Sequence, residues 1–130
     1  MDKKDLEIVS LLTDNSRLSW KNIGDQVYLS GQAVGSRVQQ LIDDSIIEKF
    51  TIKRHYDNLQ FITIYMNSNQ FTIFEQLVSD YDDVISMEKI TGDGCYFIQS
   101  CFDHNSLEQF INTISPYARY KINHRLKTIK

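Results

Sequence analysis

The stretch GDQVYLSGQAVGSRVQQL, residues 24–41, decides how the first third of the chain folds. Two short segments with helical apolar spacing meet in it across the brief connection Tyr28-Leu29. Ser30 is a good N-cap for the second segment, because a serine side chain there accepts a hydrogen bond from a backbone N–H of the first helical turn. The inward positions of that segment follow the i, i+4, i+7, i+8 spacing of an amphipathic helix: Val34, Val38, Leu41 and Ile42.

Two more helices are predicted before this point. The first begins at Asp2 or its neighbours and carries an apolar stripe made by Leu6, Val9 and Leu12, joined by Ile8 and Leu11. Ser19 caps the second, short helix, which points Ile23 and Val27 inward. Two short helices joined by a tight turn and braced by a first helix form the helix-turn-helix arrangement.

The apolar rhythm changes after Ser45. Residues 46–56, IIEKFTIKRHY, alternate and are rich in β-branched and aromatic side chains, which predicts a strand or small wing. Beyond them the pattern predicts strands over 61–66, 84–90, 95–102 and 118–129, a helix over 70–81, and a second helix that begins at Asp103 or Asn105 and ends before Pro116.

The order βαββαβ is that of a ferredoxin-like antiparallel sheet with two helices on one face. We therefore expect an α+β chain in three parts. These are a winged helix-turn-helix domain over 1–50, a wing or linker strand over 51–60, and a βαββαβ domain for ligand sensing and assembly over 61–130.

Composition limits the classes of function. The net charge of −3 argues against a general binder of polyanions, but residues 1–56 are neutral and residues 57–130 carry the whole excess of acid. Any contact with nucleic acid should therefore come from the first part, through the local placement of charge. No segment approaches the roughly 20 apolar residues that span a bilayer, so we expect a soluble, cytoplasmic protein.

Neither a catalytic nor a metal site is expected. Cys95 and Cys101 lie too far apart along one predicted strand to form a disulfide, and they have no zinc-ligand spacing. The three histidines are scattered, and no set of nucleophile, base and acid falls on adjacent elements. We expect no cofactor.

In order and spacing, these features resemble the Lrp/AsnC family of transcription regulators (leucine-responsive and asparagine-synthesis regulators) over nearly the whole chain. The matching residues are Asp5, Arg17, Ser19, Leu29-Ser30, Arg37, Leu41, Ile46-Ile47 after Ser45, Thr91-Gly92 and the final Ile129-Lys130. The resemblance implies a regulator that binds double-stranded DNA through its recognition helix. It also implies a second domain that assembles into homodimers and octamers and that binds an amino acid or other small effector.

The polar outer face of the recognition helix supplies the candidate contacts with DNA. Gly31 and Gly35 would let the backbone approach the duplex, and glutamine can form two hydrogen bonds with adenine. The candidates for base edges and phosphates are Lys21, Ser30, Gln32, Ser36, Arg37, Gln39, Gln40, Lys53 and Arg54. Two alternatives stay open: the polar residues only solvate a surface helix, and Arg37 holds a structural salt bridge within the small domain.

Two departures from the family pattern concern the sites. Tyr28 stands where members commonly carry a glycine with positive φ, so it either accepts strain or sits in a modified turn. The candidate effector loop consists of Thr91, Gly92, Asp93, Gly94 and Cys95. Its Cys95 takes the place of the usual aspartate, so weak binding of amino acids is expected. The same loop could also be a simple hairpin turn.

Two other functions remain as alternatives. Proteins of this two-part plan act in the decarboxylation of tetrapyrroles (siroheme), and Lys53-Arg54-His55 could bind propionates. The low basic content also fits a sensing partner that regulates related proteins by mixed assembly without binding DNA well.

Overall fold

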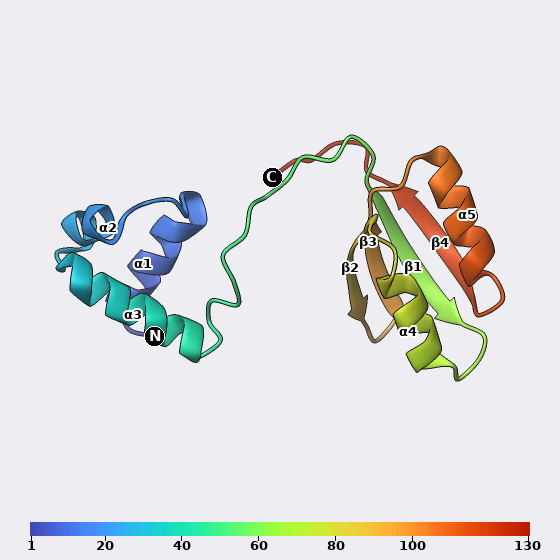
Figure 1. Cartoon of the computed structure of the whole chain (residues 1–130), viewed down its shortest axis with the longest axis horizontal. Helices are drawn as coiled ribbons and strands as arrows, with labels where there is room; N and C mark the ends of the chain where they lie inside the picture. Colours follow the sequence, from blue (N-terminus) through green and yellow to red (C-terminus); the bar gives the residue numbers. More distant parts are fainter. The chain divides into compact units, whose positions relative to one another are not determined.

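The computed structural model describes all residues, 1–130, as two compact units, Met1–Lys53 and Arg54–Lys130. The first unit contains the helices α1 (Lys3–Asp14), α2 (Trp20–Val27) and α3 (Gly31–Asp43) (Figure 1). The second contains β1 (Gln60–Met66), α4 (Phe71–Ser79), β2 (Val84–Lys89), β3 (Tyr96–Ser100), α5 (His104–Ile114) and β4 (Ala118–His124). The predicted three helices and the βαββαβ order are confirmed. None of the helices is long and apolar enough to cross a bilayer.

Side-chain caps determine where most helices begin. Ser19 Oγ accepts a hydrogen bond from the backbone N–H of Asn22 at 3.0 Å, and Ser30 Oγ accepts one from Ala33 at 3.1 Å. Asp2 forms a reciprocal capping box with Asp5 at the start of α1. These caps confirm the predicted starts of the three helices.

The cap of α5 is one of the two residues predicted from the sequence. Asp103 is the N-cap, and its carboxylate accepts a hydrogen bond from the backbone N–H of Ser106 at 2.8 Å. Asn105, the alternative start, already lies inside the first helical turn.

The core of the first unit is made by one face of each helix. Its buried members are Ile8, Leu12, Ile23, Val27, Val34 and Val38. Leu6 and Ile42, which were expected to point inward, are 54% and 36% exposed. Each residue turns a helix by about 100°, so positions two before Ile8 and one after Leu41 point away from the core.

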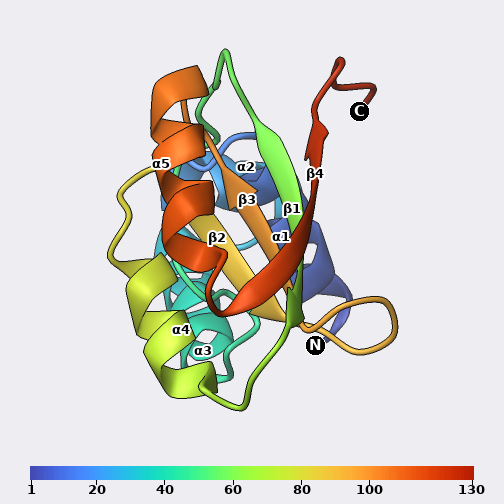
Figure 2. The same ribbon diagram turned by 90° about the vertical axis from the view of Figure 1, so that its right-hand side faces the viewer.

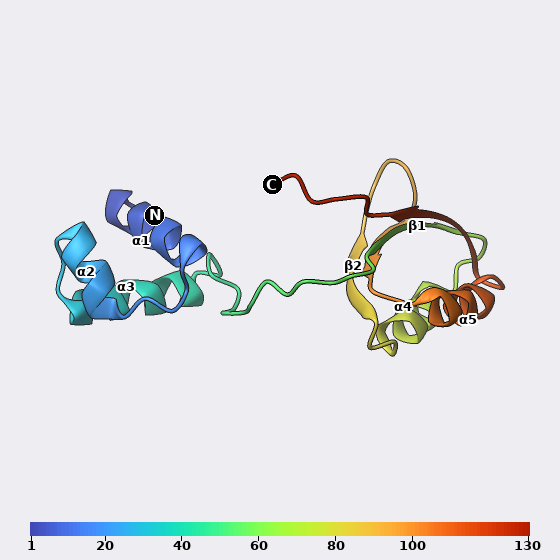
Figure 3. The ribbon, with the colours of Figure 1, turned by 90° about the horizontal axis from the view of Figure 1, so that it is seen from above.

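The second unit is a four-stranded antiparallel sheet with the strand order β2-β3-β1-β4. Both helices, α4 and α5, cover the same face of this sheet, as the views along it show (Figures 2 and 3). The core between sheet and helices is completely buried at Ile62, Ile64, Phe74, Val78, Ile98, Phe110 and Ile114. The ferredoxin-like prediction is confirmed.

One predicted strand segment is absent from the structure, and another is shorter than the sequence pattern indicates. Residues 46–56 form no strand, so the expected wing was wrong for the single chain. A strand needs hydrogen bonds from its backbone groups to a neighbouring strand, and residues 46–56 form none. β4 ends at His124 instead of residue 129, because its partner β1 begins at Gln60, which faces His124.

One buried polar side chain closes the end of the sheet. Gln60, only 2% exposed, accepts hydrogen bonds from Ser100 Oγ at 2.8 Å and from the backbone N–H of Phe102 at 3.0 Å. Its amide nitrogen donates to the carbonyl oxygen of Phe102 at 3.0 Å. β1 is thereby tied to the segment that leaves β3.

Replacing Gln60 by leucine should lower the free energy of unfolding of the second unit by about 2–4 kcal/mol, because three buried polar groups lose their partner. Faster hydrogen exchange of the β3 amides would report the loss. The matched control is Gln109→Leu on the exposed side of α5, which should leave the exchange unchanged. Equal exchange rates in the two variants would contradict the proposed importance of this network.

Candidate nucleic-acid interface

The turn between α2 and α3 depends on Gly24. A Cβ atom at this position would lie 2.3 Å from the carbonyl oxygen of Leu29, closer than any non-bonded carbon and oxygen approach. The carbonyl of Gly24 accepts the backbone N–H groups of Tyr28 and Leu29, the latter at 3.0 Å. Tyr28 adopts the left-handed conformation, with φ 62° and ψ 44°, so the prediction of strain at this residue is confirmed.

Gly31 and Gly35 face α2, not the outside. A Cβ on Gly31 would lie 3.3 Å from the backbone nitrogen of Lys21, and one on Gly35 would lie 3.1 Å from Cδ1 of Trp20. The expectation that these glycines let DNA approach was therefore wrong. Their small size lets α2 and α3 pack closely, and the indole of Trp20 lies against Gly35 of α3.

The exposed face of α3 carries a stripe of neutral polar residues. Gln32, Ser36 and Gln39 are exposed at i, i+4 and i+7, and so share one side of the helix. Gln39 donates to Asp43 at 3.0 Å, whereas the side chains of Gln32 and Ser36 have no hydrogen-bond partner. The structure thus brings together three of the predicted base-reading residues, two of them with free hydrogen-bonding groups.

Gln40 and Ser30 are engaged within the unit. Gln40 donates to Asp44 at 2.9 Å, and Ser30 serves as the cap of α3. Ser30 is exposed at the start of α3, where its hydroxyl can still donate a hydrogen bond outward. The prediction that either residue contacts DNA stays a prediction.

Arg37 is held by two carboxylates. One guanidinium nitrogen lies 2.6 Å from Asp2 and 3.1 Å from Asp5, which confirms the alternative of a structural salt bridge. The hydrogen bond from Arg37, followed by the backbone N–H of Asp5, lowers the pKa of the Asp2 carboxyl. The ion pair connects α1 to α3 and leaves little of the positive charge for a phosphate.

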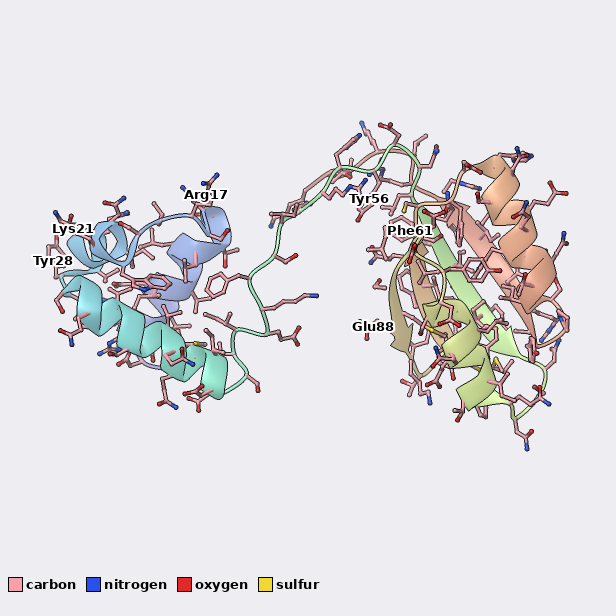
Figure 4. All side chains as sticks on the ribbon, in the orientation of Figure 1. Arg17, Lys21, Tyr28, Tyr56, Phe61 and Glu88 are labelled. Atoms are coloured by element: carbon pink, nitrogen blue, oxygen red, sulfur yellow. The ribbon has the colours of Figure 1, made fainter.

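The remaining predicted cations fall in different places. Lys21 is exposed at the start of α2 (Figure 4). Lys53 is exposed at the end of the first unit. Arg54 belongs to the second unit, where its guanidinium lies 5.2 Å from the centre of the Tyr56 ring. Lys53 and Arg54 thus fall on either side of the boundary between the two units, and their contact with DNA stays a prediction.

Sequence reasoning missed the surroundings of Tyr28. Its ring is 88% exposed, and the ammonium group of Lys4 lies 5.4 Å from the ring centre. The same ammonium donates a hydrogen bond to the carbonyl oxygen of Val27 at the end of α2. The signal that could have identified this site is a tyrosine at a position that favours glycine.

The predicted effector loop connects β2 with β3 in the second unit. Gly92 and Gly94 both have positive φ, and the carboxylate of Asp93 accepts a hydrogen bond from Tyr65 at 3.0 Å. That bond raises the pKa of the Tyr65 hydroxyl. The backbone N–H of Cys95 donates to Ile64 at 2.7 Å, which fixes the loop to β1. Cys95 and Cys101 are both free thiols and flank β3.

A hollow of about 260 Å³ lies beside this loop. It is lined by Phe71, Lys89, Ile90, Gly94, Cys95 and Tyr96. The ammonium of Lys89 lies 3.1 Å from the carboxylate of Glu75, which also accepts a hydrogen bond of 2.5 Å from the Tyr96 hydroxyl. The positive charge at the hollow is therefore already paired, and its walls are largely apolar.

Comparisons with known proteins find family models that match both units of the chain. A family model of the AsnC-type helix-turn-helix domain matches residues 1–42, and one of the Lrp/AsnC ligand binding domain matches residues 59–130. The chain is similar to the HTH-type transcriptional regulator LrpA of Bacillus subtilis, with 34% identity over 130 residues that cover 95% of this chain and 96% of LrpA. LrpB of the same organism is 26% identical over 136 residues, covering 100% of this chain and 91% of LrpB.

Solved structures show the same architecture. The structure of B. subtilis LrpC superposes with a TM-score of 0.91 at 25% identity and covers 100% of this chain and 97% of LrpC. A transcriptional regulator from Neisseria meningitidis, solved as a complex with L-Met, superposes with a TM-score of 0.86 at 24% identity. That match covers 100% of this chain and 92% of the Neisseria protein, and it supports the fold.

Replacing Arg37 by methionine should lower the melting temperature of the first unit at neutral pH, because Asp2 and Asp5 lose their cation. The folded pKa of Asp2 lies below the ordinary value of 3.8, so the stabilisation is present above that value and is lost as the pH falls through the lowered pKa. Thermal unfolding of both proteins from neutral to acidic pH should show the difference shrinking in acid.

The matched control is Arg17→Met, which removes an exposed cation from the same unit. This variant should melt close to the unmodified protein at every pH. A deficit of Arg37→Met that stayed constant down to strong acid would contradict the role of the ion pair.

Proposed function

The chain belongs to the Lrp/AsnC family of transcriptional regulators, and we propose that it binds specific duplex sites as a homodimer, with α3 of each protomer in the major groove. The observation that carries this proposal is the exposed stripe Gln32, Ser36 and Gln39 on a helix braced by α1 and α2. The similar curated proteins are named transcriptional regulators. No finding supports the enzymatic alternative.

Amides and a hydroxyl, not cations, would read the bases. The free amide of Gln32 can donate to and accept from the major-groove edge of adenine, and Ser36 can pair with any base. Gln39 donates one N–H to Asp43 and keeps its carbonyl and second N–H for the groove. These groups favour sites that contain A·T pairs, arranged as a rough palindrome to match a two-fold dimer.

Phosphate contacts would be few. Lys21 is exposed on α2, Lys53 ends the first unit and Arg54 begins the second, whereas Arg37 is engaged by Asp2 and Asp5. Each neutralised phosphate adds to the dependence of affinity on salt, so this set predicts a modest salt slope.

Selection of genomic fragments by the full-length protein at low salt tests the DNA proposal. Gln32→Ala and Gln39→Ala should change which base is preferred at one position of each half-site, whereas Lys21→Ala should weaken all sites alike. Gln109→Ala in α5 is the matched control and should select the same sites as the unmodified protein. Failure to enrich any sequence would refute the proposed function.

The face of the sheet that no helix covers has the features of a subunit interface. Phe61 and Phe97 stack on it with their ring centres 6.1 Å apart. Both side chains are only partly exposed in the single chain, and Phe61 alternates along β1 with the buried Gln60 and Ile62, which places it on the opposite face from them. An apolar patch of this kind on a soluble domain usually has a partner.

The charges on this face are self-complementary. Register pairs place Glu88, Phe97, Thr63 and Lys121 in one row across the sheet, with Glu88 on the edge strand β2 and Lys121 on the opposite edge strand β4. A two-fold axis parallel to the strands would lay β2 of one copy over β4 of the other. Glu88 of each copy would then lie over Lys121 of its partner, so a second copy of this chain is the occupant that we propose.

Charge exchange tests this geometry. Glu88→Lys alone and Lys121→Glu alone should weaken the dimer, because each places like charges opposite one another. The double exchange should restore it, and Glu108→Lys on α5 should have no effect. Sedimentation over a range of concentrations measures the association. A monomer at micromolar concentration would contradict the dimer, and a double variant no tighter than the single ones would contradict this orientation. Further association into octamers stays a prediction.

The loop Thr91–Cys95 is where we propose that a small effector would bind. The support is the match of residues 59–130 to the ligand binding domain, together with the apolar hollow beside Gly94 and Cys95. Asp93 already accepts a hydrogen bond from Tyr65, and the loop has no second carboxylate for an ammonium group. Free amino acids should therefore bind weakly and leave the DNA affinity unchanged in the selection assay.

A further inference from the structure

Tyr28 has a left-handed backbone conformation, which a residue with a side chain rarely adopts. Its φ of 62° and ψ of 44° lie in the left-handed region. For a residue with a Cβ atom this region is less favourable than the right-handed helical region, and glycine escapes that strain. The turn between α2 and α3 would therefore form more easily with glycine at this position.

The side chain does not stabilise the fold in return. The ring is 88% exposed, and its hydroxyl forms no hydrogen bond with the protein. The one aromatic contact is the ammonium of Lys4, 5.4 Å from the ring centre, in a setting where such a contact contributes little. Strain that packing does not explain is a sign that the residue acts on something outside the chain.

The position of Tyr28 in the first unit indicates which kind of molecule it contacts. It stands two residues before Ser30, the cap of the recognition helix, and Figure 4 shows it at the same end of the first unit as Lys21. The hydrogen bond from Lys4 to Val27 holds an ammonium group beside the ring. A phenol and a cation would thus flank the end of α3 that enters the major groove, where the sugar–phosphate backbone runs.

We propose that Tyr28 binds the DNA backbone beside the recognition helix. Its hydroxyl donates a hydrogen bond to a phosphate oxygen, its ring packs on a deoxyribose, and the ammonium of Lys4 faces the same phosphate. The inference rests on the proposed DNA-binding function and adds a contact that orients α3 without reading a base. It assigns a role to a residue that contributes no net charge.

The variants Tyr28→Gly and Tyr28→Phe test this contact in the full-length protein. Tyr28→Gly should raise the melting temperature of the first unit, because the strain is relieved, and should weaken binding to every selected DNA site by about tenfold or more. Tyr28→Phe keeps the strain and the ring but lacks the hydroxyl. It should melt like the unmodified protein and bind DNA with intermediate affinity.

Ser45→Gly is the matched control. Ser45 and Tyr28 are the two non-glycine residues with positive φ, and φ of Ser45 is 59°. Ser45 lies just beyond the C-terminal end of α3, whereas Tyr28 precedes its N-terminal end. Its replacement should also raise the melting temperature but leave DNA binding unchanged. Tyr28→Gly binding selected DNA as tightly as the unmodified protein would overturn the inference alone. An unmodified protein that selects no DNA would overturn the proposed function and this inference with it.

Discussion

The close approach of Gly24 to the carbonyl of Leu29 determines the geometry of the first unit. A Cβ at residue 24 would lie 2.3 Å from that oxygen, so the turn can close only on a residue without a side chain. Once it closes, α3 must cross α2 at short range, which is why Gly35 stands against Trp20. One side of α3 then packs against the other two helices, and Gln32, Ser36 and Gln39 on the opposite side are exposed to solvent.

This arrangement lets an acidic chain recognise a polyanion. Arg37, near the middle of α3, forms ion pairs with Asp2 and Asp5. Its positive charge therefore helps to fix the orientation of α3 against α1. Under the proposed function, neutral amides and hydroxyls would then face the groove. Such groups discriminate between base pairs but add little attraction at long range. Specificity would thus depend on how firmly α3 is held, and the ion pair with α1 contributes to that firmness.

Much of this structure could be predicted because local rules and tertiary packing agree. Ser19 and Ser30 cap helices as their type and position indicate, and the alternation of Ile62 and Ile64 matches a strand with one buried face. Other features depend on contacts that no local pattern contains. The pairing of Arg37 with Asp2 joins residues 35 positions apart, and Gly35 faces the ring of Trp20 instead of solvent. Residues 46–56 have the pattern of a strand but form no backbone ladder with another strand.

The contact between Trp20 and Gly35 also gives the molecule an intrinsic optical probe. Trp20 is the one tryptophan of the chain, and its indole lies at the junction of α2 and α3. Its emission therefore reports the environment of that junction, while the second unit, which has tyrosines but no tryptophan, is silent when only indole is excited. Fluorescence can thus follow the opening of the helix-turn-helix separately from the unfolding of the sheet, with no label attached.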